Sequence, residues 1–404
     1  MDRLAHRKAK ATITILDESG LPSAGAKVRL KQTGHDFLFG CGVFEAVALQ
    51  KEKDPTRRAA LSSLLEKWLA LFNYGTLPFY WGRYEPEEGQ TDEAATMAAA
   101  RALTTRGVTL KGHPLCWHTV CAPWLLRYSN EEILSRQLNR IRRELTAFRG
   151  IIDFWDVINE VVIMPEFDKY DNAVTRICKS CGRVPLVRAV FDEARVTNPQ
   201  ATLLINDFNT SSAYEHLIED LLDAGVPVSA IGIQSHQHQG YWGRDKVEDV
   251  LMRFSRFGLP LHFTENTLIS GDLMPGHIVD LNDYQVSKWP STAEGEARQC
   301  REIVEMYSLL FEHPSVQAIT AWDFRDDAWL HAPAGLIRVD GSPKPAYEAL
   351  MRLIHGSWET DVTLHADELG IVELNGFKGT YRAEREEKST EFELHEYCRI
   401  ALRL

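Results

Sequence analysis

Short apolar runs recur along the chain, and amphipathic stretches separate them. Most of these runs are continuously apolar, which is typical of parallel strands that are covered on both faces. The pattern predicts strands at residues 37–43, 72–76, 109–113, 154–159, 202–207, 230–234, 261–265 and 318–322.

The stretches between these runs have the apolar spacing of helices. One begins at Asp54-Pro55, and another follows Ser129, a residue type that favours the N-terminal cap. Further helices are predicted near residues 185–197, 212–224, 244–257, 293–311 and 344–354. Eight strand–helix units in succession predict an α/β fold, a single (β/α)₈ TIM barrel that spans residues 36–355.

The two ends of the chain alternate apolar and polar residues, as half-buried strands do. Residues 11–34 predict a hairpin with its turn at 17–20, and Asn375-Gly376 predicts a second turn. The later strands are expected at 361–365, 371–374, 379–383 and 391–404. We therefore expect residues 1–35 and 356–404 to form an accessory β module packed on the barrel. Its expected role is structural, and only Phe377 and Tyr381 favour a sugar-binding role.

The chain has 404 residues and a formal net charge of -12, which argues against nucleic acid or an anionic membrane as a partner. No apolar run is long enough to span a bilayer. Residues 1–8 are charged and have no apolar h-region. We therefore expect no signal peptide in this chain, and either a cytoplasmic location or secretion with the signal already removed. The sequence does not indicate an oligomeric state.

Seven cysteines cannot all pair within one chain, and a chain of this size does not need disulfides to fold. Their spacing indicates mostly buried thiols. Cys178 and Cys181 could form half of a zinc site or a redox pair, but no second cysteine pair completes four ligands. A loop disulfide or two packed thiols is the favoured interpretation of this pair.

Two isolated glutamates follow apolar runs, Glu160 after the fourth predicted strand and Glu265 at the end of the seventh. In a TIM barrel the active site lies at the carboxyl ends of the strands. Two facing carboxyl groups are what glycoside cleavage requires, because one protonates the leaving oxygen while the other attacks the anomeric carbon or activates water. The alternative is that both glutamates form buried ion pairs.

Tryptophans gather at or just beyond the predicted strand ends. Flat aromatic rings pack against the apolar C–H faces of sugars, so the clustering favours a carbohydrate ligand, although any single ring could instead belong to the core. The tryptophans of this predicted rim are Trp81, Trp117, Trp124, Trp242, Trp289, Trp322 and Trp329. Trp68, Trp155 and Trp358 are expected in the core.

Five strand-end motifs together resemble glycoside hydrolase family 10, the family of retaining endo-β-1,4-xylanases. They lie at residues 112–118, 155–160, 204–209, 231–236 and 263–265, and the resemblance covers roughly 36–355. It implies a hydrolase that cleaves β-1,4-xylosidic bonds in xylan or xylo-oligosaccharides by double displacement, with no metal or organic cofactor.

The resemblance also implies residue roles. Glu160 would be the general acid/base and Glu265 the nucleophile, with their carboxyl groups about 5–5.5 Å apart. Asn159 would hydrogen-bond the sugar 2-hydroxyl, and His236 would hydrogen-bond the nucleophile. The expected substrate-binding residues are His113, Trp117, Asn159, Gln234, His236, Trp322, Trp329, Tyr80 and Trp81.

The chain departs from the family pattern in three places. Where the family has Glu-Asn-x-x-Lys-Trp after the second strand, this chain has residues 76–81, Thr-Leu-Pro-Phe-Tyr-Trp. Thr267 stands where the family has the aspartate that orients the histidine. The last aromatic motif, between Trp322 and Trp329, is one residue short. The first departure favours an alternative substrate, another β-glycoside or a short oligosaccharide.

Two alternatives of another class stay open. A barrel that kept the groove and lost the chemistry would be a non-catalytic carbohydrate-binding protein. His236 and His238, with His113 and His118, could instead be metal ligands, although such a site needs a complete ligand set and supporting hydrogen bonds.

Overall fold

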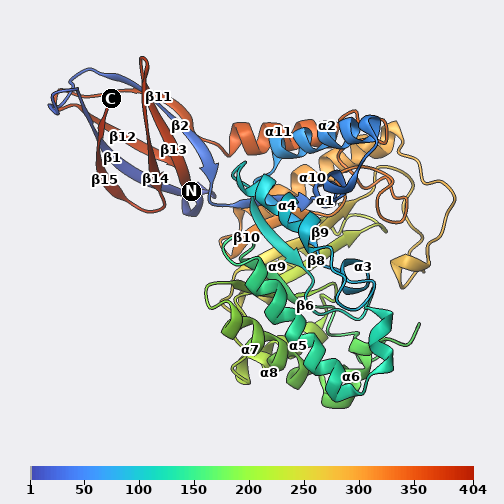
Figure 1. Ribbon diagram of the computed structural model, residues 1–404. Coiled ribbons are helices and arrows are strands. Elements are labelled where there is room, and N and C mark those ends of the chain that lie inside the picture. The colour runs from blue at the N-terminus through green and yellow to red at the C-terminus, as the bar shows by residue number, and fades with distance from the viewer. Residues whose placement is uncertain (1) are drawn as a thin grey trace.

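The computed structural model describes residues 2–404, in which eight parallel strands close into a barrel and helices surround it (Figure 1). Sequential strands are neighbours, and β10 closes the barrel against β3. The barrel strands are β3 Leu38–Gly42, β4 Tyr74–Pro78, β5 Thr109–His113, β6 Phe154–Asn159, β7 Thr202–Asp207, β8 Ala230–Gln237, β9 Leu261–Leu268 and β10 Val316–Ala321. The predicted (β/α)₈ fold is confirmed.

β8 and β9 continue three residues beyond the predicted ends at 234 and 265. The extensions pair with each other, His236 opposite Thr267 and Gln237 opposite Leu268, after a register shift that follows Gln234. A strand is predicted from the spacing of its apolar residues, and the residues of these extensions are mostly polar. The predicted strands therefore end too early here. The extension holds His236 and Thr267 in register at the mouth of the barrel.

The predicted helices form around the barrel with their expected caps. Asp54 accepts a hydrogen bond from the Arg57 N–H at the start of α2, and Ser129 forms a reciprocal capping box with Glu132 at the start of α5. The helices are α1 Phe44–Lys51, α2 Pro55–Leu71, α3 Trp81–Tyr84, α4 Glu93–Thr104, α5 Asn130–Ala147, α6 Ala173–Cys181, α7 Arg183–Thr197, α8 Ser212–Asp223, α9 Gly243–Ser255, α10 Ala293–Glu312 and α11 Pro345–Arg352. Short helical turns are η1 Ala5–Arg7, η2 Pro123–Arg127, η3 Leu281–Asp283 and η4 Leu353–Ser357.

Cys178 and Cys181 lie on α6 and not in a loop, and both thiols are free. The loop disulfide is therefore wrong: the two residues lie almost one helical turn apart, with Cys178 buried and Cys181 exposed. Among the helices of residues 2–404, none combines the length and the apolar character that crossing a membrane requires.

The two ends of the chain form two sheets that pack on each other beside the barrel, and most of their strand pairs are antiparallel. Figure 1 shows both chain ends there. One sheet has the order β12-β1-β15 and the other β11-β2-β13-β14. The strands are β1 Lys8–Leu16, β2 Lys27–His35, β11 Asp361–His365, β12 Ile371–Phe377, β13 Gly379–Arg385, β14 Lys388–Leu394 and β15 Cys398–Arg403. Residues such as Ile13 and Val28, fully buried, form the core between the sheets.

Two expectations for this module are wrong. β1 and β2 do not form a hairpin, because they belong to different sheets and the segment between them crosses from one layer to the other. Gly376 lies inside β12 and not in a turn; a Cβ there would come within 2.4 Å of the Tyr381 hydroxyl. Tyr381 and Phe377 are themselves buried, so neither ring offers a face to a sugar.

The module is joined to the barrel by an arginine and an aromatic cluster. The Arg7 guanidinium donates to the carbonyl oxygens of Phe311, His313 and Val316, and it lies over the Phe37 ring. Phe311 in turn packs on Trp358, which is 4.4 Å away between ring centroids. The expected core positions of Trp68, Trp155 and Trp358 are confirmed, since each is at most 5% exposed.

Candidate active site

Glu160 and Glu265 both lie at the carboxyl end of the barrel with left-handed backbone, at a φ of 56° each. Such a conformation is uncommon for a residue other than glycine and costs roughly 1–3 kcal/mol, so neighbouring contacts must hold it. The Glu160 N–H donates to the Asn206 carbonyl at 2.8 Å, and the carbonyl of Asn266 accepts from Trp322 N–H at 3.0 Å. Adjacent strands therefore fix the direction of both carboxyl groups.

The Glu160 carboxyl receives three neutral N–H donors, from Trp117 Nε1 at 2.9 Å, from Gln234 Nε2 at 3.3 Å and from Asn159 Nδ2 at 3.4 Å. Burial, assisted by the negative charge of Glu265, raises the pKa of Glu160 to about 8, although the Trp117 hydrogen bond lowers it. The side chain is 15% exposed, so it can still meet a substrate. At neutral pH this carboxyl group carries a proton.

Glu265 has charged and polar partners that Glu160 lacks. Its oxygens accept from Asn206 Nδ2 at 2.7 Å and from His236 Nε2 at 3.1 Å, and His113 Nδ1 lies 4.0 Å away. Burial by itself raises the pKa of Glu265, but the nearby His113 and Lys111, together with the His236 hydrogen bond, outweigh it and lower the pKa. Glu265 is therefore ionised at neutral pH.

A chain of amides joins the two carboxyl groups. Asn206 Nδ2 donates to Asn159 Oδ1 at 2.8 Å as well as to Glu265, and Asn159 Nδ2 donates to Glu160 Oε1 at 3.4 Å. Gln234 Nε2 donates to the same Asn159 oxygen at 3.0 Å. Asn206 was part of a recognised strand-end motif but not an expected site residue. Its polar side chain near the end of β7, a strand paired with β6, is the signal that could have identified it.

Behind His113 lies a buried ion pair. Asp156 Oδ2 is 2.7 Å from His113 Nδ1 and 2.8 Å from Lys111 Nζ, and all three side chains are at most 1% exposed. Burial opposes ionisation of Asp156, but Lys111 and His113 lower its pKa below the ordinary value. The carboxylate therefore orients the His113 ring beside Glu265.

Four of the expected aromatic residues surround this network. The Trp322 ring is 5.2 Å from His113, and the Trp329 ring is 4.7 Å from His236. The Tyr80 ring is 5.7 Å from both His113 and Trp117. These rings line the same end of the barrel as the two glutamates.

Trp81 is not brought to the network. It is 5% exposed, its indole N–H donates to Glu85 Oε2 at 3.1 Å, and its ring packs on Trp124 at 5.9 Å. The Arg140 guanidinium covers the ring at 5.0 Å. Trp81 thus packs within the wall of the barrel, next to the site and not facing it.

Three of the four candidate histidines, His113, His236 and His238, have hydrogen-bond partners within the protein. His113 faces Asp156, His236 faces Glu265, and Thr267 Oγ1 lies 3.4 Å from His236 Nδ1 and 3.3 Å from His238 Nδ1. Within residues 2–404, no group of three or more His, Cys, Asp or Glu side chains is arranged to hold a metal ion. The metal-site alternative therefore lacks its ligand set.

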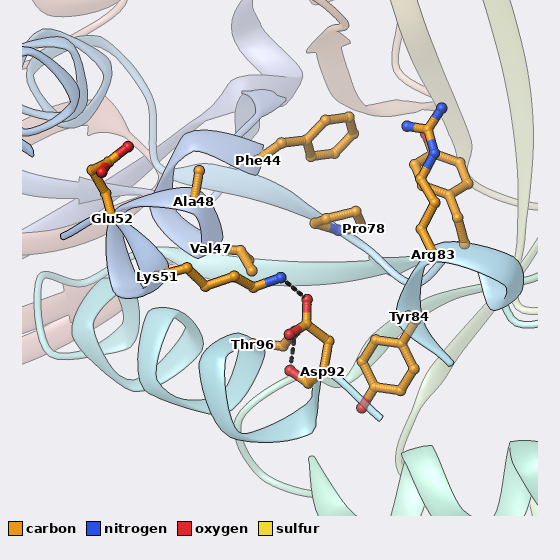
Figure 2. A pocket seen from close by; sticks show the side chains of 11 residues that line it. Phe44, Val47, Ala48, Lys51, Glu52, Pro78, Arg83, Tyr84, Asp92 and Thr96 are labelled. Carbon is orange, nitrogen blue, oxygen red and sulfur yellow. Dashed lines mark hydrogen bonds and ion pairs between the residues drawn. The ribbon is translucent and has the colours of Figure 1, made fainter. Parts of the chain in front are cut away.

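A pocket of about 430 Å³ has Tyr80 in its lining, and Figure 2 shows the side chains around it. Lys51 pairs with Asp92 across it, and the Arg83 guanidinium lies 5.6 Å from the centre of the Tyr80 ring. The lining residues come from α1, the end of β4, α3 and α4: Phe44, Val47, Ala48, Lys51, Glu52, Pro78, Tyr80, Arg83, Tyr84, Asp92 and Thr96. Tyr80 is thus shared between the pocket and the glutamate network.

Comparison with known proteins gives a consistent picture. The sequence profile described as Glycosyl hydrolase family 10 matches residues 78–353, more than half of the chain. Endo-1,4-beta-xylanase B of Thermotoga neapolitana is 26% identical over 246 residues, which are 57% of this chain and 65% of that protein. The chain thus spans less than two thirds of that relative. Endo-1,4-beta-xylanase 2 of Arabidopsis thaliana is 24% identical over 91% of this chain and 31% of its own length.

Among solved structures, xylanase 10B of Thermotoga petrophila in complex with xylobiose has a TM-score of 0.65 at 20% identity. The match covers 80% of this chain and 95% of that one. At this identity the likeness concerns the fold, and it agrees with the closed barrel described above.

Proposed function

The chain belongs to glycosyl hydrolase family 10, and from this membership we propose that it hydrolyses β-1,4-xylosidic bonds in xylan or xylo-oligosaccharides with retention of configuration. The names of the xylanase relatives support the substrate class. The residue roles rest on the geometry and charge of Glu160, Glu265 and their partners.

The observation that carries the proposal is that the pKa values of the two carboxyl groups are shifted in opposite directions. The pKa of Glu160 is raised to about 8 by burial, while that of Glu265 is lowered, against its burial, by His113, His236 and Lys111. Two neighbouring carboxyl groups, one with a raised and one with a lowered pKa, are suited to act as a proton donor and an anionic nucleophile. The amide chain through Asn159 and Asn206 keeps the two in one rigid frame.

In the proposed reaction the Glu265 carboxylate attacks the anomeric carbon while Glu160 gives its proton to the departing glycosidic oxygen. The carbon–oxygen bond to the leaving sugar breaks as the bond to Glu265 forms. Glu160, now ionised, takes a proton from water, whose oxygen attacks the same carbon and releases Glu265. Two inversions give net retention.

The substrate is expected to lie between the aromatic rings. Trp322 and Trp329 offer apolar faces next to Glu265, and Asn159 is available to a sugar 2-hydroxyl once its amide group shifts from Glu160. Hydrogen bonds to that hydroxyl can strengthen as the transition state forms.

Azide rescue with an aryl β-xyloside tests the roles separately. E265A should lose several orders of magnitude in turnover, and added azide should restore it with an α-xylosyl azide as product, because only one displacement then occurs. E160A should be rescued to a β-xylosyl azide, since its covalent intermediate still forms. Activity near that of the unaltered protein in E265A, or the opposite product configurations, would exclude this assignment.

A second candidate, a family member acting on another β-glycoside or on a short oligosaccharide, is favoured by the end of β4. Thr76 and Leu77, at two of the three positions where the family has polar groups that grip the next xylose, are fully buried. At the third, the Tyr80 ring lies 5.7 Å from those of His113 and Trp117 and also lines the pocket that contains Lys51 and Arg83. Comparing kcat/KM across aryl β-xyloside, β-glucoside and xylobioside substrates distinguishes these substrates, and a non-catalytic binding barrel would turn over none of them.

A further inference from the structure

Two histidines at the end of β8 share a single threonine hydroxyl on β9. Thr267 Oγ1 lies 3.4 Å from His236 Nδ1 and 3.3 Å from His238 Nδ1, and it accepts the Gln237 N–H at 3.2 Å. Thr267 and His238 are at most 1% exposed. The other ring nitrogen of His236, Nε2, contacts Glu265. The Thr267 hydroxyl and the Glu265 carboxylate therefore contact the two nitrogens of the same imidazole ring.

The hydrogens available to this group decide where the protons lie. A threonine hydroxyl has one hydrogen to donate and two lone pairs that accept. The Gln237 N–H occupies one lone pair. One donated hydrogen and one lone pair then remain for two imidazole nitrogens, so one Nδ1 must be protonated and the other must not be.

The surroundings of His238 determine which nitrogen is protonated. Its Nε2 is buried and has no hydrogen-bond partner among residues 2–404. A hydrogen on that atom would be an unsatisfied buried N–H, which is rare and costly. Burial also lowers the pKa of His238 to about 3, so the ring is neutral and its one hydrogen lies on Nδ1, directed at Thr267.

Thr267 must then donate to His236 Nδ1, which leaves the hydrogen of His236 on Nε2, facing Glu265 Oε2 at 3.1 Å. We propose that Thr267 is a positioning residue whose hydroxyl, held by His238, fixes His236 in the tautomer that donates an N–H to Glu265. The functional part of this inference rests on the proposed role of Glu265 as nucleophile. A neutral side chain thus takes the position that the family resemblance assigns to an aspartate.

The titratable groups near His236 come from several strands. Glu265 on β9 accepts its Nε2–H, and His238 on β8 lies 5.9 Å away between ring centroids. His113 and Lys111 on β5, and Glu160 after β6, act on it through Glu265. Loss of the His236 donor should therefore raise the pKa of Glu265, since that bond helps to lower it.

Long-range ¹H–¹⁵N NMR of the uniformly labelled full chain tests the tautomers without any substrate. H236N and H238N each remove one ring and assign the two signal sets. We expect His236 as the Nε2–H tautomer and His238 as the Nδ1–H tautomer at pH 7. Any other combination overturns the hydrogen-bond chain. Because this result does not depend on turnover, it stands even if the protein cleaves no xyloside.

The acid limb of the pH profile tests the consequence for Glu265. T267V, which has nearly the same shape but no hydroxyl, should move the acid limb of kcat/KM to higher pH and lower its maximum roughly tenfold. T267S, which keeps the hydroxyl, should have its acid limb at the same pH as the unaltered protein. A purely structural role would lower the thermal stability of T267V without moving the limb, and an unmoved limb would overturn the proposal. If T267V does not fold, the tautomers of the unaltered protein decide.

Discussion

At the scale of single residues, Glu160 and Glu265 differ through what they contact and not through how deeply they lie. The side chains are 15% and 6% exposed, respectively, and both residues have left-handed backbone. Glu160 has neutral donors and negative neighbours, so burial dominates and its pKa rises. Glu265 has His113, Lys111 and the His236 hydrogen bond beside it, so these partners outweigh burial and its pKa falls. Identical side chains thereby acquire opposite acid–base behaviour.

The Trp117 indole should set the alkaline limit of activity. Its N–H stabilises the charged form of Glu160, so W117F should raise the pKa of Glu160 further and move the alkaline limb of kcat/KM upward from about pH 8. W124F is the matched control, because the Trp124 indole donates to the Glu85 carbonyl and not to Glu160. An alkaline limb that stays in place in W117F would contradict the hydrogen bond's role.

Glu160 should also cost stability at neutral pH. Its pKa is about 8 in the folded chain and 4.5 as the ordinary value, so the folded state holds the proton more tightly. Stability is then fully present below pH 4.5 and is lost as the pH rises toward 8, by up to about 1.4 kcal/mol per pH unit. E160Q should therefore unfold at a higher temperature than the unaltered protein at pH 7 and at nearly the same temperature at pH 4. An equal difference at both pH values would contradict this linkage.

At the scale of elements, the sequence predicted the barrel because most of its strands contain a short apolar run. β5, β6 and β7 begin and end at the predicted residues. The extension of β8 and β9 was not predictable from hydrophobicity, because the residues that pair there, such as His236 and Thr267, are polar. Glu160 and Glu265 were identifiable by their position after apolar runs, whereas the contacts of Asn206 and Thr267 depend on which strands become neighbours.

The same limit explains the terminal strands. Alternation correctly indicated β structure within residues 11–34, but alternation describes one strand and not its partner. β1 pairs with β12 and β15, and β2 with β11 and β13, all from the other end of the chain. Partners that lie more than 300 residues away leave no local signal, so the hairpin was the wrong inference from a correct pattern.

Gly232 on β8 should be required for the amide network. A Cβ at this position would lie 2.4 Å from Asn206 Oδ1, so G232A must displace the amide that joins Asn159 to Glu265. We expect kcat/KM to fall on the order of 100-fold, the usual effect of a small misplacement in an active site. G276A is the control, because nothing lies within 4 Å of its new methyl group. Equal activity in the two variants would show that Asn206 tolerates displacement.

At the scale of the whole molecule, the accessory module meets the barrel at Arg7. Arg7 donates to Val316 at the start of β10, whereas the glutamates lie at the carboxyl end of the barrel. R7A should lower the free energy of unfolding by about 2 kcal/mol or more, since three carbonyl oxygens lose a charged donor. R3A, which removes an exposed ion pair with Glu312, should cost less than about 0.5 kcal/mol. Urea unfolding measures both, and kcat should be the same in both variants. A loss of kcat in folded R7A would mean that the module acts on the site.

The whole barrel, with its rim of aromatic rings and two unlike glutamates, is proposed to retain configuration at a β-xylosidic bond. A proton NMR time course of xylohexaose with the purified protein tests this most directly. Internal cleavage in which the β-anomer appears first, before mutarotation, is the predicted result. An α-anomer formed first would contradict double displacement by Glu160 and Glu265, and an absence of cleavage would contradict the proposed substrate.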